Sequence, residues 1–395
     1  MEGRRSATLV VVDGTGGVRG GLGPVEVAEP WWPEVGPVVD AVAGPLPGAV
    51  VLRLLRAEPD PGHGMGGRVT YLVQCDAEVE VGLLREVAAA DRELLAPHPR
   101  RLPWAEPGGP AADVAWVRSV VEVTGPPRQH KTWNLSSIWS FPVERDPGPG
   151  RVWLKAVPPF MAHETAVLEV LADRPVPRLL AADGHRQLLA PLPGDDGWQA
   201  TRAERDEMIG TLVSLQSAAA GRVDELLDRG VPDHRDGPLA DALSAIVARL
   251  APGRDPLSSL VDELPDRLAA AARFSPAPTL LHGDPHPGNC RRGVSPPVWF
   301  DWGDAMIANP MLDLAVIERL GTDAVATWDR AWTEAAPGCD PARSGSLLRP
   351  VAALREAWVY QRFLDGIEPT ERVYHRDDVE RMLDEAERLV VGEAG

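Results

Sequence analysis

The chain has 395 residues, of which 44% are hydrophobic and 25% charged, so it is long enough for two or three domains of ordinary soluble composition. Its formal net charge of −18 argues against nucleic acid or an anionic membrane as a partner, because both select a basic surface, whereas a cationic small substrate would suit it. The three cysteines form no CxxC pair, which predicts reduced thiols in a cytoplasmic protein. No apolar run is long enough for a membrane span or a signal peptide, and nothing in the sequence indicates a protein partner.

Residues 1–105 have the pattern of a small α/β accessory domain. The predicted elements are strands over 8–12, 49–55 and 68–73, a helix over 83–95, and helical spacing over 31–42 that Gly36-Pro37 interrupts. The mixture resembles a degenerate Nudix domain, but Arg85-Glu86 is not followed by the glutamate pair of a Nudix hydrolase. We therefore interpret the region as accessory, and a Nudix-like hydrolase activity remains a minor alternative.

Residues 110–193 have the pattern of a small strand-rich lobe. The predicted elements are a helix over 112–123, a strand hairpin over 131–135 and 138–143, a strand over 151–157, a helix over 162–172 and a strand over 186–190. Residues 191–194, Pro-Leu-Pro-Gly, then break the chain.

Residues 194–395 are mainly helical by the spacing of their apolar residues. The predicted helices cover 201–227, 239–250, 256–274, 311–320, 324–334, 346–363 and 377–391. A small β-rich lobe followed by a larger helical lobe is a bilobal α+β layout.

The most informative stretch begins His282-Gly283-Asp284 and reaches Asn289, and Asp301-Trp302-Gly303-Asp304 follows twelve residues later. A loop of five residues can direct Asp284 at a hydroxyl and turn Asn289 back to a metal ion, while Asp301 approaches from a separate strand. Carboxylate and amide oxygens are ligands that Mg²⁺ prefers. Each residue alone would be an ordinary turn residue, but the complete set in this order favours phosphoryl transfer.

Three further side chains of this stretch have two interpretations each. The pair His282 and His286 could ligate zinc, but we favour loop support by hydrogen bonds for both. The carboxylate of Asp304 either hydrogen-bonds within its own turn or is solvated.

These residues, with Pro310 and Asp313-Leu314-Ala315, resemble the motifs of the aminoglycoside phosphotransferase and choline kinase superfamily. The resemblance covers residues 110–395 and implies a bilobal protein-kinase-like fold. It also implies that Asp284 is catalytic and that Asn289 and Asp301 bind magnesium.

A kinase also needs a lysine on a small-lobe strand and a glutamate on the next helix. Lys155 lies on the predicted strand 151–157, and Glu164 lies early in the following helix. Because Lys131 and Lys155 are the only lysines, a lysine at this place is informative.

The other expected nucleotide contacts lie in two segments of weaker pattern. The turn of the predicted hairpin has no glycine, but Ser136 and Ser137 could meet phosphate oxygens. In the expected connection between the lobes, the backbone of Ala190 and Leu192 could bind adenine.

The sequence thus predicts a Mg²⁺-dependent phosphotransferase that moves the γ-phosphate of ATP or GTP to a hydroxyl of a small molecule. A nucleotide-binding pseudokinase that acts as a regulatory or scaffold module is the alternative, suggested by the glycine-free turn. Candidates for contact with the phosphate acceptor are Asp195, Asp196, Trp198, Trp358, Tyr360, Asp365 and Glu368.

Overall fold

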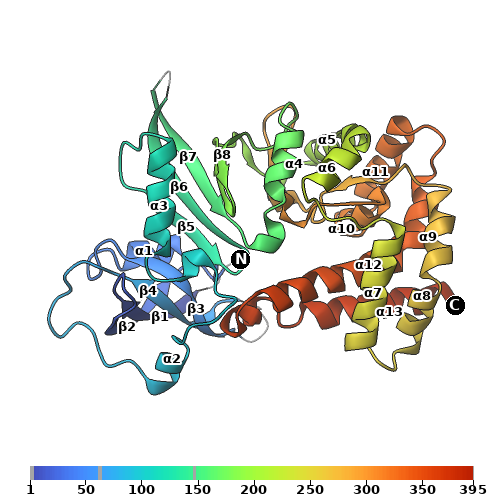
Figure 1. The fold of residues 1–395 in the computed structure, drawn as a ribbon. Coiled ribbons are helices and arrows are strands. Elements are labelled where there is room, and N and C mark those ends of the chain that lie inside the picture. Colours follow the sequence, from blue (N-terminus) through green and yellow to red (C-terminus); the bar gives the residue numbers. More distant parts are fainter. Residues whose placement is uncertain (1–3, 61–64, 146–147, 395) are drawn as a thin grey trace. The chain divides into compact units, whose positions relative to one another are not determined.

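The structure is a computed structural model that describes residues 4–60, 65–145 and 148–394 (Figure 1). Its contacts divide the chain into two compact units, each built from segments that are far apart in the sequence. Unit 1 comprises Met1–Pro159, Leu180–Pro191 and Phe363–Arg376. Unit 2 comprises Phe160–Leu179, Leu192–Arg362 and Asp377–Gly395.

The first sheet of unit 1 has the strand order β2-β1-β4-β3, in which β1 and β4 are parallel and the other pairs antiparallel. Its strands are β1 (Arg5–Val12), β2 (Val18–Val27), β3 (Val50–Glu58) and β4 (Gly67–Gln74). The three strands predicted here are confirmed. Strand β2 was not expected, because its sequence VRGGLGPVEV is rich in residues that are rare in strands.

Two helices belong to this part of unit 1. The prediction of a helix over 83–95 is wrong over most of that range. Helix α1 (Gly36–Ala41) occupies only the end of the segment with helical spacing. The helix expected over 83–95 is reduced to α2 (Ala89–Glu93). The cause is a pair of backbone hydrogen bonds between Gly21 and Arg85, of 2.8 and 2.9 Å, which holds residue 85 against β2 in an extended bridge.

The second sheet of unit 1 has the order β5-β6-β7-β9-β8. Its strands are β5 (Arg128–Trp133), β6 (Ser136–Arg145), β7 (Gly148–Ala156), β8 (Leu179–Asp183) and β9 (Arg186–Leu189). Helix α3 (Gly109–Val120) packs on this sheet through Val117, which is buried with Trp139 and Phe141. A short 3-10 turn, η1 (Pro103–Ala105), precedes the helix.

Side chains of β5 satisfy the open edge of β3 and so join the two sheets of unit 1. The Gln129 amide donates to the carbonyl of Val51 at 2.7 Å and accepts from its N–H at 2.9 Å, as a neighbouring strand would. The Thr132 hydroxyl donates to the carbonyl of Leu52 at 3.4 Å.

The predicted division into three domains, residues 1–105, 110–193 and 194–395, has other boundaries than these two compact units and stays a prediction.

The segment Phe363–Arg376, which we call the inserted segment, joins unit 1 although it lies near the end of the chain. It contains the 3-10 helix η8 (Pro369–His375). Tyr374 lies in the core beneath the first sheet, with its ring 5.6 Å from that of Trp133. The side-chain amide of Asn134, at the tip of the β5–β6 hairpin, is 2.9 Å from Nε2 of His375.

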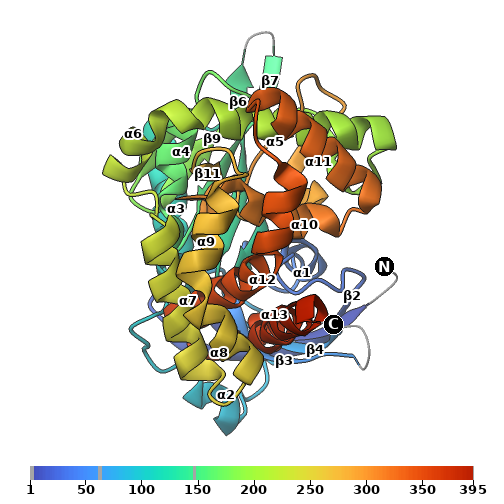
Figure 2. The same cartoon turned by 90° about the vertical axis from the view of Figure 1, so that its right-hand side faces the viewer.

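Unit 2 is built mainly from helices, as predicted, and Figure 2 shows α7, α8 and α9 in the same part of it as α13. Its helices are α4 (Glu164–Val170), α5 (Arg202–Ala219), α6 (Val223–Asp228), α7 (Asp236–Leu250), α8 (Asp255–Asp262), α9 (Leu264–Ala272), α10 (Leu314–Glu318), α11 (Thr322–Ala335), α12 (Pro341–Gly366, whose end enters unit 1) and α13 (Asp378–Ala394). Arg254, just before α8, pairs with Glu380, Asp384 and Glu387 of α13. The described part of the chain contains no helix that is long and apolar enough to cross a membrane.

Five short strands in unit 2 carry the loops of the predicted motif. Strands β10 (Asp195–Asp196), β12 (Cys290–Arg292) and β13 (Val298–Trp299) form one small sheet. Strands β11 (Thr279–Leu281) and β14 (Met306–Ala308) form another. The α+β class is thus confirmed.

Candidate active site

The loop from His282 to Asn289 connects β11 to β12 and is held from below by a buried carboxylate. Asp313 is completely buried and accepts the backbone N–H groups of His282 at 2.9 Å and Gly283 at 3.1 Å. The side-chain amide of Gln216 donates a third hydrogen bond to it at 2.7 Å. Burial raises the pKa of Asp313 to about 6, although the Arg355 guanidinium opposes this rise.

His282 ties the same loop to the strand that precedes Asp301. Its Nε2 donates to the carbonyl of Phe300 at 3.0 Å, and its Nδ1 accepts the N–H of Asp284 at 3.4 Å. Both ring nitrogens are therefore engaged within the loop, which leaves neither for a metal. Within the described ranges, no group of three or more His, Cys, Asp or Glu side chains is placed to hold a metal ion.

Asp284 is reachable by a small molecule, since its side chain is 44% exposed. Protein atoms nevertheless enclose the carboxyl group on several sides, and this desolvation raises its pKa to about 7. The negative charges of Asp301 and Glu356 raise the pKa further. The motif thus brings together carboxylates whose mutual repulsion a cation would relieve.

Asn289 and Asp301 have oxygens suited to a hard cation. The Asn289 side-chain N–H group donates to the carbonyl of Asp284 at 3.0 Å and to its carboxylate at 3.4 Å, and no hydrogen bond joins Oδ1 of Asn289 to another described residue. Asp301 is exposed and has φ +65° and ψ +62°, the left-handed conformation that side chains rarely adopt. Among the described residues other than glycine it alone has a positive φ. Such strain is most often found at functional sites.

Gly283 allows the two loops to meet. Its φ is +88°, and a Cβ there would lie only 2.1 Å from the carbonyl oxygen of Asp304. The Asp304 side chain is 17% exposed, and desolvation raises its pKa to about 6 although Arg362, 3.5 Å away, lowers it. Asp304 therefore forms an ion pair with a helix residue, which neither of the two sequence interpretations described.

His286 connects Asp284 to an exposed tryptophan. Its Nδ1 accepts the N–H of Gly288 at 3.0 Å, and its Nε2 lies 3.4 Å from Oδ2 of Asp284. The ring of Trp198 stacks on His286 with centroids 5.1 Å apart and planes 17° apart, yet its side chain is 62% exposed. Gly288 makes room for this stack, because a Cβ there would lie 2.7 Å from both rings.

The lysine and glutamate of the predicted pair belong to different units. Lys155 lies on β7, between Ile138 of β6 and Gln187 of β9, and is 8% exposed. Glu164 is the first residue of α4, is 1% exposed, and accepts the N–H of Trp302 at 3.0 Å. Glu164 thus anchors the turn that follows Asp301.

The hairpin turn is shifted from its expected place. It consists of Asn134 and Leu135, and Ser136 and Ser137 already belong to β6. Their hydroxyls accept hydrogen bonds from indoles, Ser136 from Trp133 at 3.0 Å and Ser137 from Trp139 at 3.1 Å. Residues Ala190 and Leu192 fall on either side of the point where the chain passes from unit 1 to unit 2.

Two arginines of α12 support the loops and were missed from the sequence. Arg355, 1% exposed, donates to the carbonyl of Gly283 at 3.4 Å, and Arg362 pairs with Asp304. They are seven residues apart, which places them on one face of a helix. Two arginines at this spacing inside a predicted helix were the pattern in the sequence that could have indicated this supporting role. The acceptor candidate Glu368 is 3% exposed and paired with Arg101.

Comparisons with solved structures show the fold. The chain resembles the macrolide 2′-phosphotransferase MphH from Brachybacterium faecium, at 18% identity and TM-score 0.50 over 68% of this chain and 97% of that one. It resembles the GDP complex of aminoglycoside 2′-phosphotransferase-IIIa, at 15% identity and TM-score 0.51 over 72% and 98%. It also resembles an ethanolamine kinase from Plasmodium vivax, at 10% identity and TM-score 0.51 over 77% and 95%.

A search of curated protein sequences found no match to this chain. A family model described as the phosphotransferase enzyme family matches residues 142–345, just over half of the chain. The matched range includes Lys155, Glu164 and the whole loop region from His282 to Asp313. With the protein-kinase-like fold of small-molecule kinases and a family match of this extent, the chain belongs to the phosphotransferase enzyme family.

Proposed function

We propose that the protein is a Mg²⁺-dependent kinase that transfers the γ-phosphate of ATP or GTP to a hydroxyl group of a small molecule. The observation that carries the proposal is the arrangement of Asp284, Asn289 and Asp301 on two loops that Asp313, His282 and Glu164 hold in place. The GDP complex among the similar structures supports a nucleotide as donor.

In this proposal Asp284 orients the acceptor hydroxyl and takes its proton as the phosphate is transferred. A carboxylate with a raised pKa is a better base than an ordinary one, and its exposure leaves room for the acceptor. Oδ1 of Asn289 and the carboxylate of Asp301 would hold Mg²⁺, which neutralises charge on the phosphates when bound. The engagement of Asn289 through its nitrogen alone and the left-handed conformation of Asp301 support that donor set.

The nucleotide contacts are assigned to unit 1 and to the segment that leaves it. Lys155 would hold the α- and β-phosphates, and Glu164 would position it. The hydroxyls of Ser136 and Ser137 accept hydrogen bonds from indoles, which leaves each O–H to donate to a phosphate oxygen. Backbone groups of Ala190 and Leu192 would meet the base.

The acidic surroundings of Asp284 favour an acceptor that carries a positive charge. The charges of Asp301 and Glu356 act on Asp284, and those of Asp284 and Glu356 act on Tyr360 of α12. An amino group on the acceptor would lower this repulsion. The similar solved structures include enzymes named for aminoglycoside, macrolide and ethanolamine substrates, which are all hydroxylated molecules.

The test is a screen for ADP or GDP release against aminoglycosides, macrolides, choline-like amines, amino acids and sugars. With an active acceptor, Asp284→Ala should reduce turnover by about 10²–10⁴-fold and leave nucleotide binding intact. Asp262→Ala, which removes an exposed carboxylate of α8, is the matched control and should leave turnover unchanged. Unchanged turnover in the Asp284 variant would show that this carboxylate is not the base.

A pseudokinase is the second candidate, and the two-residue, glycine-free turn at Asn134 and Leu135 favours it. The two candidates differ in what happens without an acceptor. An enzyme should hydrolyse ATP slowly in the presence of Mg²⁺, and Asp301→Ala should abolish this hydrolysis. Nucleotide binding with no hydrolysis and no active acceptor would favour the pseudokinase.

A further inference from the structure

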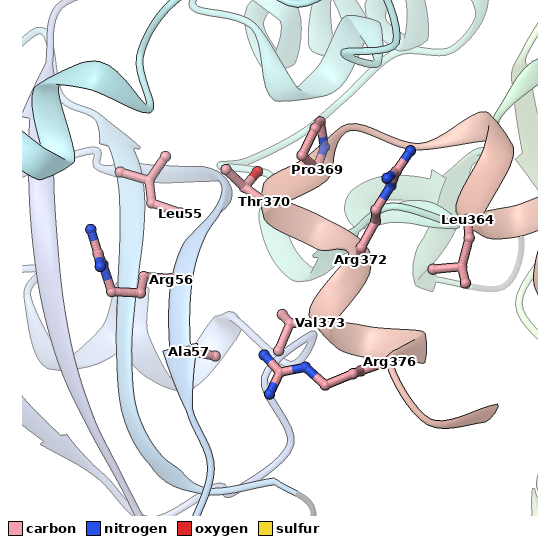
Figure 3. A pocket seen from close by; sticks show the side chains of 9 residues that line it. All are labelled: Leu55, Arg56, Ala57, Leu364, Pro369, Thr370, Arg372, Val373 and Arg376. Atoms are coloured by element: carbon pink, nitrogen blue, oxygen red, sulfur yellow. The ribbon is translucent and has the colours of Figure 1, made fainter. Parts of the chain in front are cut away.

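Unit 1 contains a pocket between the edge strand β3 and the inserted segment, and none of its lining residues belongs to the proposed active site. Its volume is about 390 Å³, within the range of small-molecule sites. Figure 3 shows the two walls, with residues of β3 on one side and residues of α12 and η8 on the other. The lining residues are Leu55, Arg56, Ala57, Leu364, Pro369, Thr370, Arg372, Val373 and Arg376.

The charge of this pocket is positive in a chain whose net charge is −18. Three of its nine lining residues are arginines, and no acidic residue lines it. Arg56 has one carboxylate neighbour, Asp91 at 3.3 Å. Arg372 and Arg376 are exposed, and no hydrogen bond or ion pair joins either of them to another described residue. Two guanidinium groups are thus available to a ligand.

The nearest carboxylates of the inserted segment do not compensate these arginines, because they are buried and bound elsewhere. Glu368 is paired with Arg53 and Arg101, and Glu371, 3% exposed, accepts a hydrogen bond from the backbone of Leu54. Neither Glu368 nor Glu371 is therefore paired with Arg372 or Arg376.

The remaining wall is suited to the body of an organic molecule. Leu55, Ala57, Leu364 and Val373 offer apolar surface beside the arginines. The hydroxyl oxygen of Thr370 is buried and has no hydrogen-bond partner among the described residues. Figure 3 shows Arg376 extending from η8 toward Ala57, across the gap between the two walls.

We propose that this pocket is a binding site for a small organic anion, a phosphate or carboxylate group attached to an apolar body. Arg376, whose side chain crosses the gap in Figure 3, binds the anionic oxygens, since guanidinium groups match phosphate and carboxylate geometry, and Arg372 adds positive charge from the same wall. Ala57 and Val373 contact the apolar part. The bound molecule contacts β3 and the inserted segment together and so stabilises their association. The site is separate from the proposed phosphoryl-transfer site.

The experiment is titration calorimetry of the full chain with phenyl phosphate and with benzoate, and with benzyl alcohol as the uncharged control. We expect at least one anion to bind about tenfold more tightly than benzyl alcohol, because charged hydrogen bonds are stronger than neutral ones. The variant carrying both Arg372→Ala and Arg376→Ala should lose at least about tenfold in affinity for that anion. Arg118→Ala on α3, an exposed arginine with no ion-pair partner among the described residues, is the control and should bind as the wild type does.

Each titration is repeated with saturating ADP and Mg²⁺, because phenyl phosphate can also enter a nucleotide site. Anion binding that persists with ADP and depends on the two arginines supports the pocket, and the tighter of the two anions identifies the preferred group. Equal affinity in the wild type and the double variant, or equal affinity for benzyl alcohol, overturns the proposal. ADP binding is measured in the same series, so failure of the nucleotide site is seen separately from failure of this pocket.

Discussion

Replacing Glu368 by glutamine should destabilise unit 1, because this carboxylate is the ion-pair partner of two buried arginines. Arg53 is fully buried and Arg101 is 5% exposed. Nε of Arg53 lies 3.5 Å from Glu368, and Nη2 of Arg101 donates to it at 3.0 Å. Each guanidinium keeps one backbone acceptor in the variant, Leu94 or Ala96. Arg53 then has no ion-pair partner among the described residues, and Arg101 keeps only Glu106, which is 3.7 Å away and 44% exposed.

The expected loss in the free energy of unfolding depends on the burial of all three side chains and on the charge that Glu371 can supply in place of Glu368. Breaking a buried ion pair on one side usually costs about 3–5 kcal/mol. Glu371 is close to the same arginines, and burial together with the charge of Glu368 raises its pKa to about 8. Once Glu368 is neutral, Glu371 can ionise near neutral pH and replace part of the lost charge. We therefore expect about 3 kcal/mol, the lower end of the range.

The assay is urea unfolding near pH 7, followed by tryptophan fluorescence and far-UV circular dichroism. Glu380→Gln is the matched control, since it removes a glutamate that is paired with Arg254 but is 63% exposed, and should cost no more than about 1 kcal/mol. The double replacement of Glu368 and Glu371 should cost more than the two single ones together. A loss in Glu368→Gln as small as that in the control, or strict additivity in the double variant, would refute the reasoning.

Three further outcomes are expected. The pKa of Glu371 is about 8 in the folded protein against an ordinary 4.5, so the folded state binds a proton that the unfolded state has released. The contribution of Glu371 to wild-type stability therefore falls by up to roughly 5 kcal/mol as the pH rises between these values. Glu371→Gln should remove this contribution in thermal unfolding scans, and parallel pH curves of the two proteins would contradict it. Asp301→Gly should abolish Mg²⁺-dependent turnover while urea unfolding shows equal stability or a gain of up to about 1 kcal/mol, because glycine adopts φ +65° without strain; a clear loss of stability would show that no strain is stored there. Trp198→Ala should lower turnover with little change in stability, since the indole is 62% exposed, and Gly288→Ala should mimic it by displacing the stack; additive effects of the two on turnover would argue against a shared cause.

Local patterns in the sequence predicted what depends on neighbours in the chain. The strand that carries Lys155, the helix that begins at Glu164 and the loop from His282 to Asn289 are all set by residues close in sequence. The helix expected over 83–95 was too long because a backbone bridge between Gly21 and Arg85 overrides the helical spacing there.

Long-range features could not be predicted in this way. Asn134 and His375 are separated by 241 positions, and Arg101 and Glu368 by 267. No periodicity in a single sequence reports contacts at such separations. Glu368 was accordingly taken for an acceptor contact, although an isolated acidic residue near the end of a helix could equally be the buried partner of distant arginines.

The inserted segment has a consequence for the order in which the protein is made. A chain usually folds its N-terminal part first as it leaves the ribosome. Here Arg53, Arg101 and the core around Trp32 receive Glu368 and Tyr374 only when more than nine tenths of the 395 residues have been synthesised. Until then Arg53 lacks its carboxylate partner, Arg101 has only Glu106, and the core beneath the first sheet is open. The N-terminal third of the protein should therefore reach its final state last, and a fragment that ends before residue 363 should fail to complete it.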